Sequence, residues 1–312
     1  MGLVLLVLPF FLWGSSMAGM KLVLDDVSPL LVAASRLVPS GALLVAYAAA
    51  QGRPQPKGMA AWAVVVVFAL VDGTLFQGAL AEGLTRTSAG LGSVIIDSQP
   101  LTVSVLAALF FGESISSVGV LGLVLGLAGL VVLELPPLGE GGSWLQAVSD
   151  AISGGAATSV PLWSRGEAWM FLAAQAMALG TVWVRVLVKT GTDPVMATGW
   201  HMILGGLPLL ALSAAREPGA LAKLLQDGLT LQDVGLLTYV SLLGGAVAYG
   251  LFFRAAAQGS LVRLSALTFL TPLFAALCGY SALGETLTQQ QLAGAGITLV
   301  GVLLVNRRSG DS

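Results

Sequence analysis

Long apolar segments, separated by short polar breaks, follow one another along the whole chain. A helix that crosses a bilayer needs about 20 predominantly apolar residues. The breaks carry loop chemistry, as in QGRPQPKG at residues 51–58. The pattern predicts an all-α integral membrane protein with ten transmembrane helices. The predicted helices cover residues 2–21, 29–50, 59–80, 87–111, 115–134, 167–188, 194–214, 234–256, 260–283 and 288–306.

One longer connection, rich in Gly, Ser and Pro, divides the chain near its middle. We therefore predict a first five-helix repeat in residues 1–135, a linker in 136–163, a second repeat in 164–306 and a cytoplasmic tail in 307–312. A cytoplasmic amino terminus would put eight Lys and Arg residues on the cytoplasmic side and five on the other. This bias follows the positive-inside rule and predicts that both termini are cytoplasmic.

The two predicted repeats share residues at matching places. A shift of 172 overlays residues 73–133 on 245–305 without a gap, and a shift of 165 aligns Arg36 with His201. Because each copy has an odd number of helices, the second copy enters the membrane from the opposite side. Inverted repeats of this kind are typical of secondary transporters, which bind substrate near the midplane. The matched residues include Gly73 and Gly245, Gly78 and Gly250, Ser88 and Ser260, Ser93 and Ser265, Pro100 and Pro272, and Glu113 and Glu285.

Composition supports the bilayer as solvent and excludes several functions. The chain is 56% hydrophobic and 10% charged, against about 25% charged residues in soluble domains. A net charge of −2 gives no basic footprint for nucleic acid. One cysteine and one histidine exclude a disulfide framework and the usual zinc sites, so we expect no metal and no cofactor. The first apolar run lacks a basic leader and is interpreted as a transmembrane helix rather than a signal peptide.

Several motifs together resemble the EamA-type members of the drug/metabolite transporter superfamily across nearly the whole chain. They are FLWGSS, IIDSQPLTVSVLAALFFGE, LSALTFLTPLFAALCGYSALGE and the stretch AAQAMALGTVWVRVLVKTGTDPVMATGWHMILGGLPLLAL, the last of which is similar to cyanobacterial and chloroplast members. The resemblance implies a ten-helix carrier with pseudo-two-fold symmetry and a central cavity lined by helices one to four and six to nine. It also implies a bacterial or cyanobacterial inner membrane, or a plastid envelope.

Charged residues inside apolar helices are the main candidates for function, because each costs about 2.5–3.5 kcal/mol to insert. Asp97 lies on a stripe of small and polar residues on the fourth helix, where Pro100 removes one helical hydrogen bond. In the second repeat Phe269 replaces Asp97, so the two halves differ in chemistry. His201 and Asp97 are candidate proton carriers. The candidate cavity residues are Trp13, Met17, Arg36, Asp72, Gln77, Ser93, Asp97, Pro100, Gln175, Trp200, His201, Tyr249, Thr268 and Thr271.

Structural roles are the alternatives for these residues. Arg36 and Asp97 could form a structural salt bridge, and His201 could be a buried neutral histidine. Trp13 could have a packing role and no contact with substrate. Glu113 and Glu285 each follow a glycine at a helix junction, so we expect them to cap the next helix. Glycines of the fifth helix (119, 122, 126, 129) and small residues of the tenth (294, 298, 301) predict close packing, either between the halves or in a homodimer.

The sequence therefore predicts a secondary active transporter, which moves a small organic metabolite such as an amino acid, amine or drug-like solute by alternating access. Coupling to protons and exchange are both open. Its partners would be this small molecule and the bilayer, and no phosphate-binding loop for ATP is present. The alternatives are a membrane enzyme acting on a lipid-linked substrate and a non-transporting scaffold or receptor, for which inverted repeats have no evident use. The few polar groups lie at mid-helix depth rather than at one membrane face, which counts against an enzyme.

Overall fold

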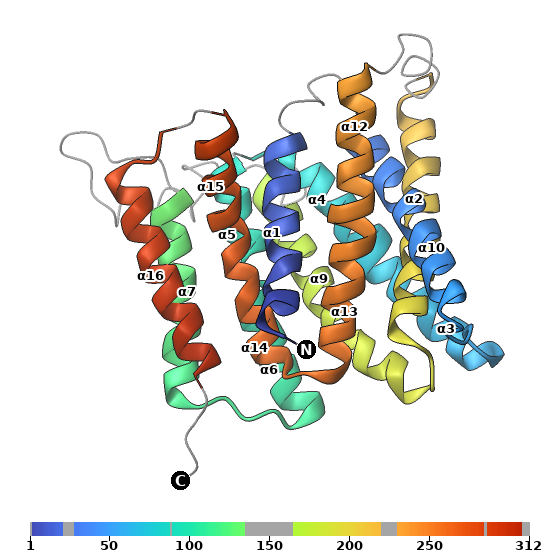
Figure 1. Ribbon diagram of the computed structural model, residues 1–312, viewed down its shortest axis with the longest axis horizontal. Helices are drawn as coiled ribbons and strands as arrows, with labels where there is room; N and C mark the ends of the chain where they lie inside the picture. The colour runs from blue at the N-terminus through green and yellow to red at the C-terminus, as the bar shows by residue number, and fades with distance from the viewer. Residues whose placement is uncertain are drawn as a thin grey trace.

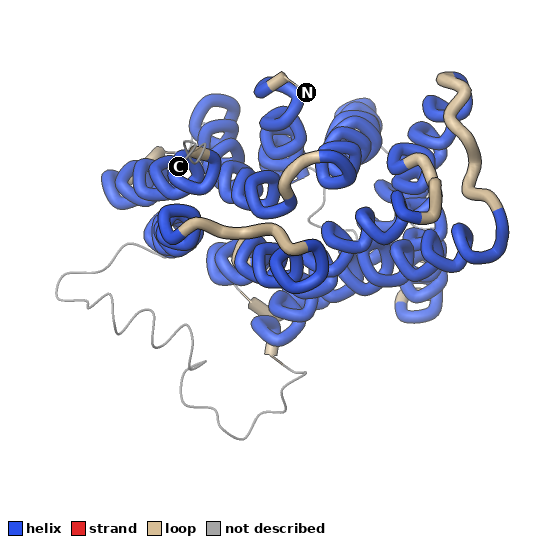
Figure 2. Tube along the Cα trace, turned by 90° about the horizontal axis from the view of Figure 1, so that it is seen from below, coloured by secondary structure: helices blue, strands red, loops and turns tan. Residues whose placement is uncertain are grey.

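The computed structural model describes residues 2–20, 28–87, 89–134, 165–219, 230–283 and 286–307, which form helices joined by short connections (Figures 1 and 2). Within these ranges, eight helical stretches are long and apolar enough to cross a membrane. The apolar helix α1 (Leu3–Met20) and α16 (Gln289–Asn306) complete the ten. The prediction of an all-α protein with ten membrane helices is confirmed.

The first half runs from α1 to α7. Several of its membrane-spanning stretches consist of more than one element, because the helix geometry changes inside the bilayer. The predicted third helix ended at residue 80, but the helical stretch continues to Leu84. After α1 the elements are α2 (Pro29–Ala50), α3 (Gly58–Phe68), η1 (Ala69–Leu75), α4 (Phe76–Leu84), α5 (Ala89–Ile96), α6 (Gln99–Phe111) and α7 (Ser117–Glu134).

The second half repeats this order. Pro194 begins α10 as Pro29 begins α2, at the helix position where the missing N–H costs nothing. Asp193 caps α10 by accepting hydrogen bonds from the backbone N–H groups of Val195 (3.0 Å) and Met196 (2.9 Å). The elements are α9 (Gly166–Lys189), α10 (Pro194–Arg216), α12 (Leu231–Tyr239), η3 (Val240–Val247), α13 (Ala248–Gln258), α14 (Leu261–Ala266), η4 (Leu267–Phe269), α15 (Leu270–Leu283) and α16.

The two halves interlock rather than forming separate lobes. Helix α2 packs along α10, α7 along α16, α1 along α15 and α4 along α9, so each of these pairs joins one half to the other. Figure 1 shows α7 and α16 side by side at one end of the bundle and α2 with α10 at the other. A Cβ added to Gly122 would lie 2.7 Å from the carbonyl oxygen of Gly301, so only glycine allows this approach. The small-residue faces thus pack between the halves of one chain.

The pseudo-two-fold axis can be located from contacts between matched residues. Gln77 and Tyr249 are separated by 172 residues and share a hydrogen bond, and Gly126 and Thr298 have the same separation and also share one. Residues related by a two-fold rotation can touch each other only where the axis passes. The axis therefore runs from the α4–α13 contact to the α7–α16 contact, as an inverted repeat requires.

Both halves change helix geometry at matching places. The π-helical segments η1 and η3 occupy equivalent positions in the third and eighth membrane stretches, with Gly73 matched to Gly245. The helix is also interrupted at Asp97 and Ser98, between α5 and α6, and the matching region of the second half contains the 3-10 turn η4. Interruptions and π-helices inside membrane helices are common at functional sites. They point to the bundle interior at mid-membrane.

Candidate functional site

Six of the residues selected from the sequence come together near the centre of the bundle. They lie on five different membrane-spanning stretches, three of the first half and two of the second. The group combines a cation, an acid, an imidazole, an amide and two aromatic rings, with one pair fully buried. We call it the axial cluster: Trp13, Arg36, Asp72, Gln77, His201 and Tyr249.

One part of the axial cluster is a chain of hydrogen bonds across the two halves. Arg36 donates from Nη2 to Oε1 of Gln77 at 3.0 Å, and Gln77 donates from Nε2 to the hydroxyl oxygen of Tyr249 at 2.9 Å. The Trp13 indole lies edge-on to the Tyr249 ring, 5.2 Å between centroids, and donates to the Gly244 carbonyl at 3.1 Å. Arg36 and Trp13 are only half-buried, so this chain extends toward accessible space.

The other part is a buried pair of titratable groups. His201 Nε2 lies 3.1 Å from Asp72 Oδ2, and the two side chains are 0% and 1% exposed. His201 Nδ1 lies 2.6 Å from the Thr198 carbonyl oxygen. Because a carbonyl only accepts, Nδ1 must carry a hydrogen. A bare imidazole nitrogen and a carboxylate both only accept, so one proton lies between Nε2 and Oδ2. In either position the pair has zero net charge.

The surroundings hold this pair in place. The Phe68 ring stacks on the His201 ring with centroids 4.1 Å apart. On the other side, a Cβ at Gly180 would lie 2.6 Å from the Asp72 Cβ, so only glycine leaves room for this carboxyl group. Asp72 Oδ1 is buried and makes no hydrogen bond within the described residues. The π-helix η1 therefore places Asp72 in a tight, largely apolar pocket.

A second polar group lies beside the break in the fourth membrane stretch. Asp97 accepts a hydrogen bond from Ser93 at 3.2 Å, and Ser93 lies 3.5 Å from an oxygen of Glu134. Asp97 and Ser93 are half-buried, whereas Pro100 is buried. Asp97 and Arg36 thus have different hydrogen-bond partners, Ser93 and Gln77, instead of the bridge considered from the sequence.

The remaining candidates lie apart from the axial cluster. Gln175 accepts a hydrogen bond from Thr102 at 3.0 Å, which links α9 to α6. Trp200 packs against Trp62 and donates to Gln55 at 2.7 Å, near the connection from α2 to α3. Thr268 is buried and donates to the carbonyl oxygen of Ser265, and Thr271 is buried in α15 against α1. The Met17 side chain lies outside the described residues.

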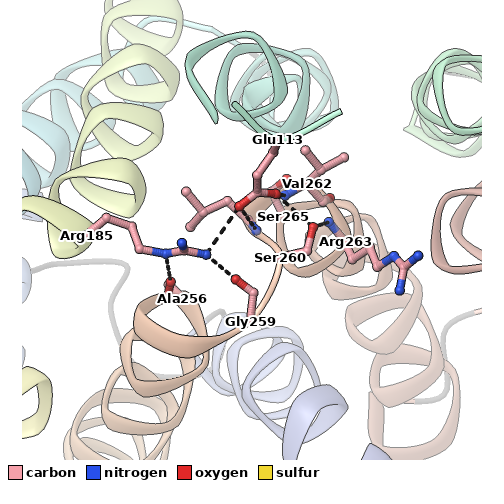
Figure 3. Close-up of polar contacts among 9 residues, drawn as sticks. Glu113, Arg185, Ala256, Gly259, Ser260, Val262, Arg263 and Ser265 are labelled. Carbon is pink, nitrogen blue, oxygen red and sulfur yellow. Dashed lines mark hydrogen bonds and ion pairs between the residues drawn. The ribbon is translucent and has the colours of Figure 1, made fainter. Parts of the chain in front are cut away.

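Glu113 caps a helix, but not the next one in sequence. Its carboxylate accepts hydrogen bonds from the backbone N–H of Leu261 (3.1 Å) and from the Ser260 hydroxyl (2.9 Å), at the start of α14 (Figure 3). Arg185 of α9 donates to the same carboxylate at 3.2 Å and to the carbonyl oxygens of Ala256 and Gly259. The expected capping role is supported, but Glu113 caps α14 and not the next helix, α7. Glu285 lies outside the described residues.

The Glu113 contact joins three membrane-spanning stretches on the side of the bundle where the chain termini lie (Figure 1). Arg185 was not among the candidate residues and entered the sequence analysis only as one of the eight basic residues on the cytoplasmic side. The signal was present, because Arg185 interrupts the apolar run VWVRVLV in the last third of a helix. In the part of the chain that the structure describes, no three His, Cys, Asp or Glu side chains gather to hold a metal.

Comparison with known proteins decides the family. The model of the EamA-like transporter family matches residues 1–135 and 164–307. The chain belongs to this family. A chloroplastic WAT1-related protein of Arabidopsis thaliana is 53% identical over 98% of this chain and 69% of its own length. An uncharacterized transporter of Synechocystis is 48% identical over 97% of this chain and 89% of its own length. A solved crystal structure with 16% identity has a TM-score of 0.76 over 97% of this chain and 96% of that one, which shows the fold.

Membership of the EamA-like family makes this chain a multi-pass membrane transporter. Its cyanobacterial and chloroplastic relatives fit a bacterial or plastid membrane. The family is one of transporters, which points away from an enzyme. A bilayer and a small-molecule substrate are the partners that such a protein requires.

Proposed function

We propose that this EamA protein is a secondary active transporter that moves a small organic metabolite by alternating access. The observation that carries the proposal is the axial cluster, which combines polar and aromatic groups at the contact between two inverted halves. Secondary transporters with inverted repeats bind substrate at such an interface. Half-buried Arg36 and Trp13 would present a guanidinium group and an aromatic ring to the substrate.

Alternating access requires a contact that closes one side and can open. The Glu113 contact fits this role, because it holds α6, α9 and α14 together through one carboxylate. Its donors are a guanidinium, a hydroxyl and backbone N–H groups, all of which water can satisfy after opening. In the conformation described here, the side of the chain termini would be closed.

The side chains of the axial cluster and of the second polar group at Asp97 favour an amphipathic substrate that carries an amino group. Half-buried Asp97 offers a carboxyl group with Ser93 beside it, and Trp13 offers an aromatic surface for an apolar or cationic part. The guanidinium group of Arg36 would suit a carboxylate, so amino acids and amines are the classes to test first.

The buried Asp72–His201 pair supports coupling to protons. The pair holds one shared proton and no net charge, and its side chains are only 0% and 1% exposed in this conformation. Loss or gain of one proton would leave a net charge in an apolar pocket, which is costly unless the conformation changes. Protonation and the change of access would thus be linked through one site.

Transport by purified protein in proteoliposomes tests the function. A panel of radiolabelled amino acids and amines would be applied with and without an imposed pH gradient, and mass spectrometry would check that the accumulated solute is chemically unchanged. We expect uptake of at least one class, increased by the gradient. Asp97→Asn should reduce this uptake at least tenfold in a folded protein. A chemically altered solute, or uptake equal to that of empty liposomes, would contradict the proposal.

A reversible cross-link tests the closing contact separately. Cysteines at Glu113→Cys and Ser260→Cys, in a Cys278→Ala background, would join α6 to α14 under oxidation. We expect the disulfide to stop net transport and reduction to restore it. A matched pair, Ser116→Cys with Gly119→Cys, joins residues of one helical turn and should have no effect. Full transport by the oxidised double variant, Glu113→Cys with Ser260→Cys, would exclude this contact as a gate.

A further inference from the structure

A groove of about 490 Å³ lies on the outer surface of the bundle, away from the axial cluster. Its walls come from α2 on one side and from η3 and α13 on the other, with Val195 of α10 between them. All but two of its lining residues are apolar or aromatic. They are Leu43, Leu44, Tyr47, Arg53, Val195, Leu242, Ala246, Val247, Gly250, Leu251 and Arg254.

The groove has the length of one leaflet and is basic at one end. On η3 and α13 the lining residues run from Leu242 to Arg254, about 18 Å at the helical rise, and one leaflet of hydrocarbon is about 15 Å thick. Arg254 lies one turn before the end of α13, and Arg53 follows the end of α2. Both arginines are therefore on the side of the chain termini, at the depth of lipid headgroups.

The guanidinium groups at this end have capacity left for an anion. Arg254 is exposed and makes no hydrogen bond or ion pair within the described ranges. Arg53 donates to Asp193 at 2.9 Å through Nη1, and 23% of its side chain remains exposed. Tyr47, 54% exposed, lies one turn before the end of α2, at the depth that tyrosine favours at membrane interfaces.

The matching place in the other half shows that the scaffold does not require an arginine. The shift of 172 takes Arg254 to Glu82, which forms ion pairs with Arg86 and Arg216 at the opposite side of the bundle. It takes Ala246 to Thr74, whose hydroxyl is bound to the carbonyl oxygen of Gly205 at 2.9 Å. The same helix position is thus occupied by a neutralised acid in one half and, in the other, by a cation that forms no ion pair with another described residue.

We propose that this groove binds one anionic phospholipid from the leaflet on the side of the chain termini. An acyl chain lies between Leu43 and Ala246, and the phosphate contacts Arg254 and Arg53. The positive-inside bias puts these arginines in the leaflet where anionic lipids attract basic residues. The charge of the lipid complements the basic end, and its length complements the apolar part. The site is independent of the transported substrate.

Native mass spectrometry of the delipidated protein tests the site. Dioleoyl phosphatidylglycerol and dioleoyl phosphatidylcholine, which have the same acyl chains, would be titrated separately. We expect one phosphatidylglycerol to bind more tightly than phosphatidylcholine. Arg254→Gln should weaken phosphatidylglycerol binding about fivefold, the equivalent of about 1 kcal/mol per basic residue. Arg263→Gln removes an exposed charge from the same side outside the groove and should change nothing.

A second variant and a soluble ligand distinguish the contribution of the apolar groove to lipid binding from that of the basic residues. Ala246→Trp fills the groove and should weaken both lipids, whereas glycerol 3-phosphate at millimolar concentration should not raise the thermal stability. Equal binding of the two lipids, or unchanged binding by Arg254→Gln, would overturn the proposal. Thermal stabilisation by glycerol 3-phosphate would also overturn it. The same holds if the protein forms a dimer that Ala246→Trp dissociates while lipid binding stays unchanged. Arg254→Gln alters an exposed side chain, so it remains informative if Ala246→Trp does not fold.

Discussion

The two halves of the molecule share their backbone geometry but differ in the chemistry of the side chains that this geometry positions. Both contain a π-helical segment at the same place, η1 and η3. In the first half this segment carries Asp72, which faces His201. In the second half Gly244 takes the equivalent place, and its carbonyl oxygen accepts a hydrogen bond from Trp13. The comparison teaches that the two halves share backbone geometry, whereas the buried Asp72–His201 pair has no equivalent at the matching place, Gly244, and is the part that our proposal assigns to proton coupling.

Removal of one member of the pair should have the largest effect on stability. His201→Phe preserves the ring that stacks on Phe68 but leaves the Asp72 carboxyl group without its partner. We expect the free energy of unfolding to fall by about 3–5 kcal/mol. The double variant with Asp72→Val should recover most of this loss. Denaturation in mixed micelles measures both, and a double variant no more stable than the single one would show that the pair is not the cause.

The glycine beside Asp72 gives the next largest effect. Gly180→Ala places a methyl group against the Asp72 side chain, and we expect a loss of about 1–3 kcal/mol from overpacking. Gly296→Ala is a matched control, because a Cβ there meets nothing within 4 Å. The control should be neutral or slightly stabilising, since alanine favours helix more than glycine does. Equal melting temperatures for the two variants would remove the argument for a close fit at Asp72.

The glutamates at matching sequence positions, Glu113 and Glu285, test whether the symmetry extends to the closing contacts. Glu113→Gln removes the charge that binds Arg185 and the start of α14, and should cost about 1–2 kcal/mol. Glu285 lies outside the described residues, so its expectation rests on the repeat alone: Glu285→Gln should cost a similar amount and lower thermal stability more than substrate affinity. A collapse of affinity in a stable Glu285→Gln protein would assign this residue to the substrate site.

The smallest effect is expected at the axis itself. Tyr249→Phe removes the acceptor for the Gln77 amide, and we expect a loss of about 1 kcal/mol. Tyr280→Phe is the control, because Tyr280 is 55% exposed. Thermal unfolding of both variants in detergent measures the difference. An effect at Tyr249 no larger than at Tyr280 would show that the bond between matched residues contributes little.

Much of the fold could be read from the sequence, because the length of each apolar segment follows from the thickness of the bilayer and the matched glycines reveal the repeat. The gathering of Arg36, Asp72, Gln77 and Tyr249 was also foreseeable, since polar groups at mid-helix depth must face the bundle interior. The π-helical geometry of η1 could not be predicted, because hydropathy does not distinguish a π-turn from an α-turn over seven residues.

The contacts of Glu113 and Trp200 show where sequence reasoning stopped. A glutamate after a glycine indicates a cap, but not which helix it caps, and its partner Leu261 is 148 residues away. Trp200 adjoins His201 in sequence yet points to Trp62 and Gln55, because neighbours on a helix face different directions. Side-chain direction at one position depends on packing that only the assembled bundle defines.

The hydrogen bond between Gln77 and Tyr249 has a consequence for the proposed cycle. If inward and outward conformations arise when the halves exchange shapes, each contact of one state becomes its symmetry mate in the other. When the halves exchange shapes, position 77 takes the place of position 249 and position 249 that of 77. A bond between two such matched residues is therefore present in both conformations. The Glu113–Ser260 bond is not, so it must break. Gln77 and Tyr249 would thus act as a fulcrum, which stays fixed while the ends of the helices move around it.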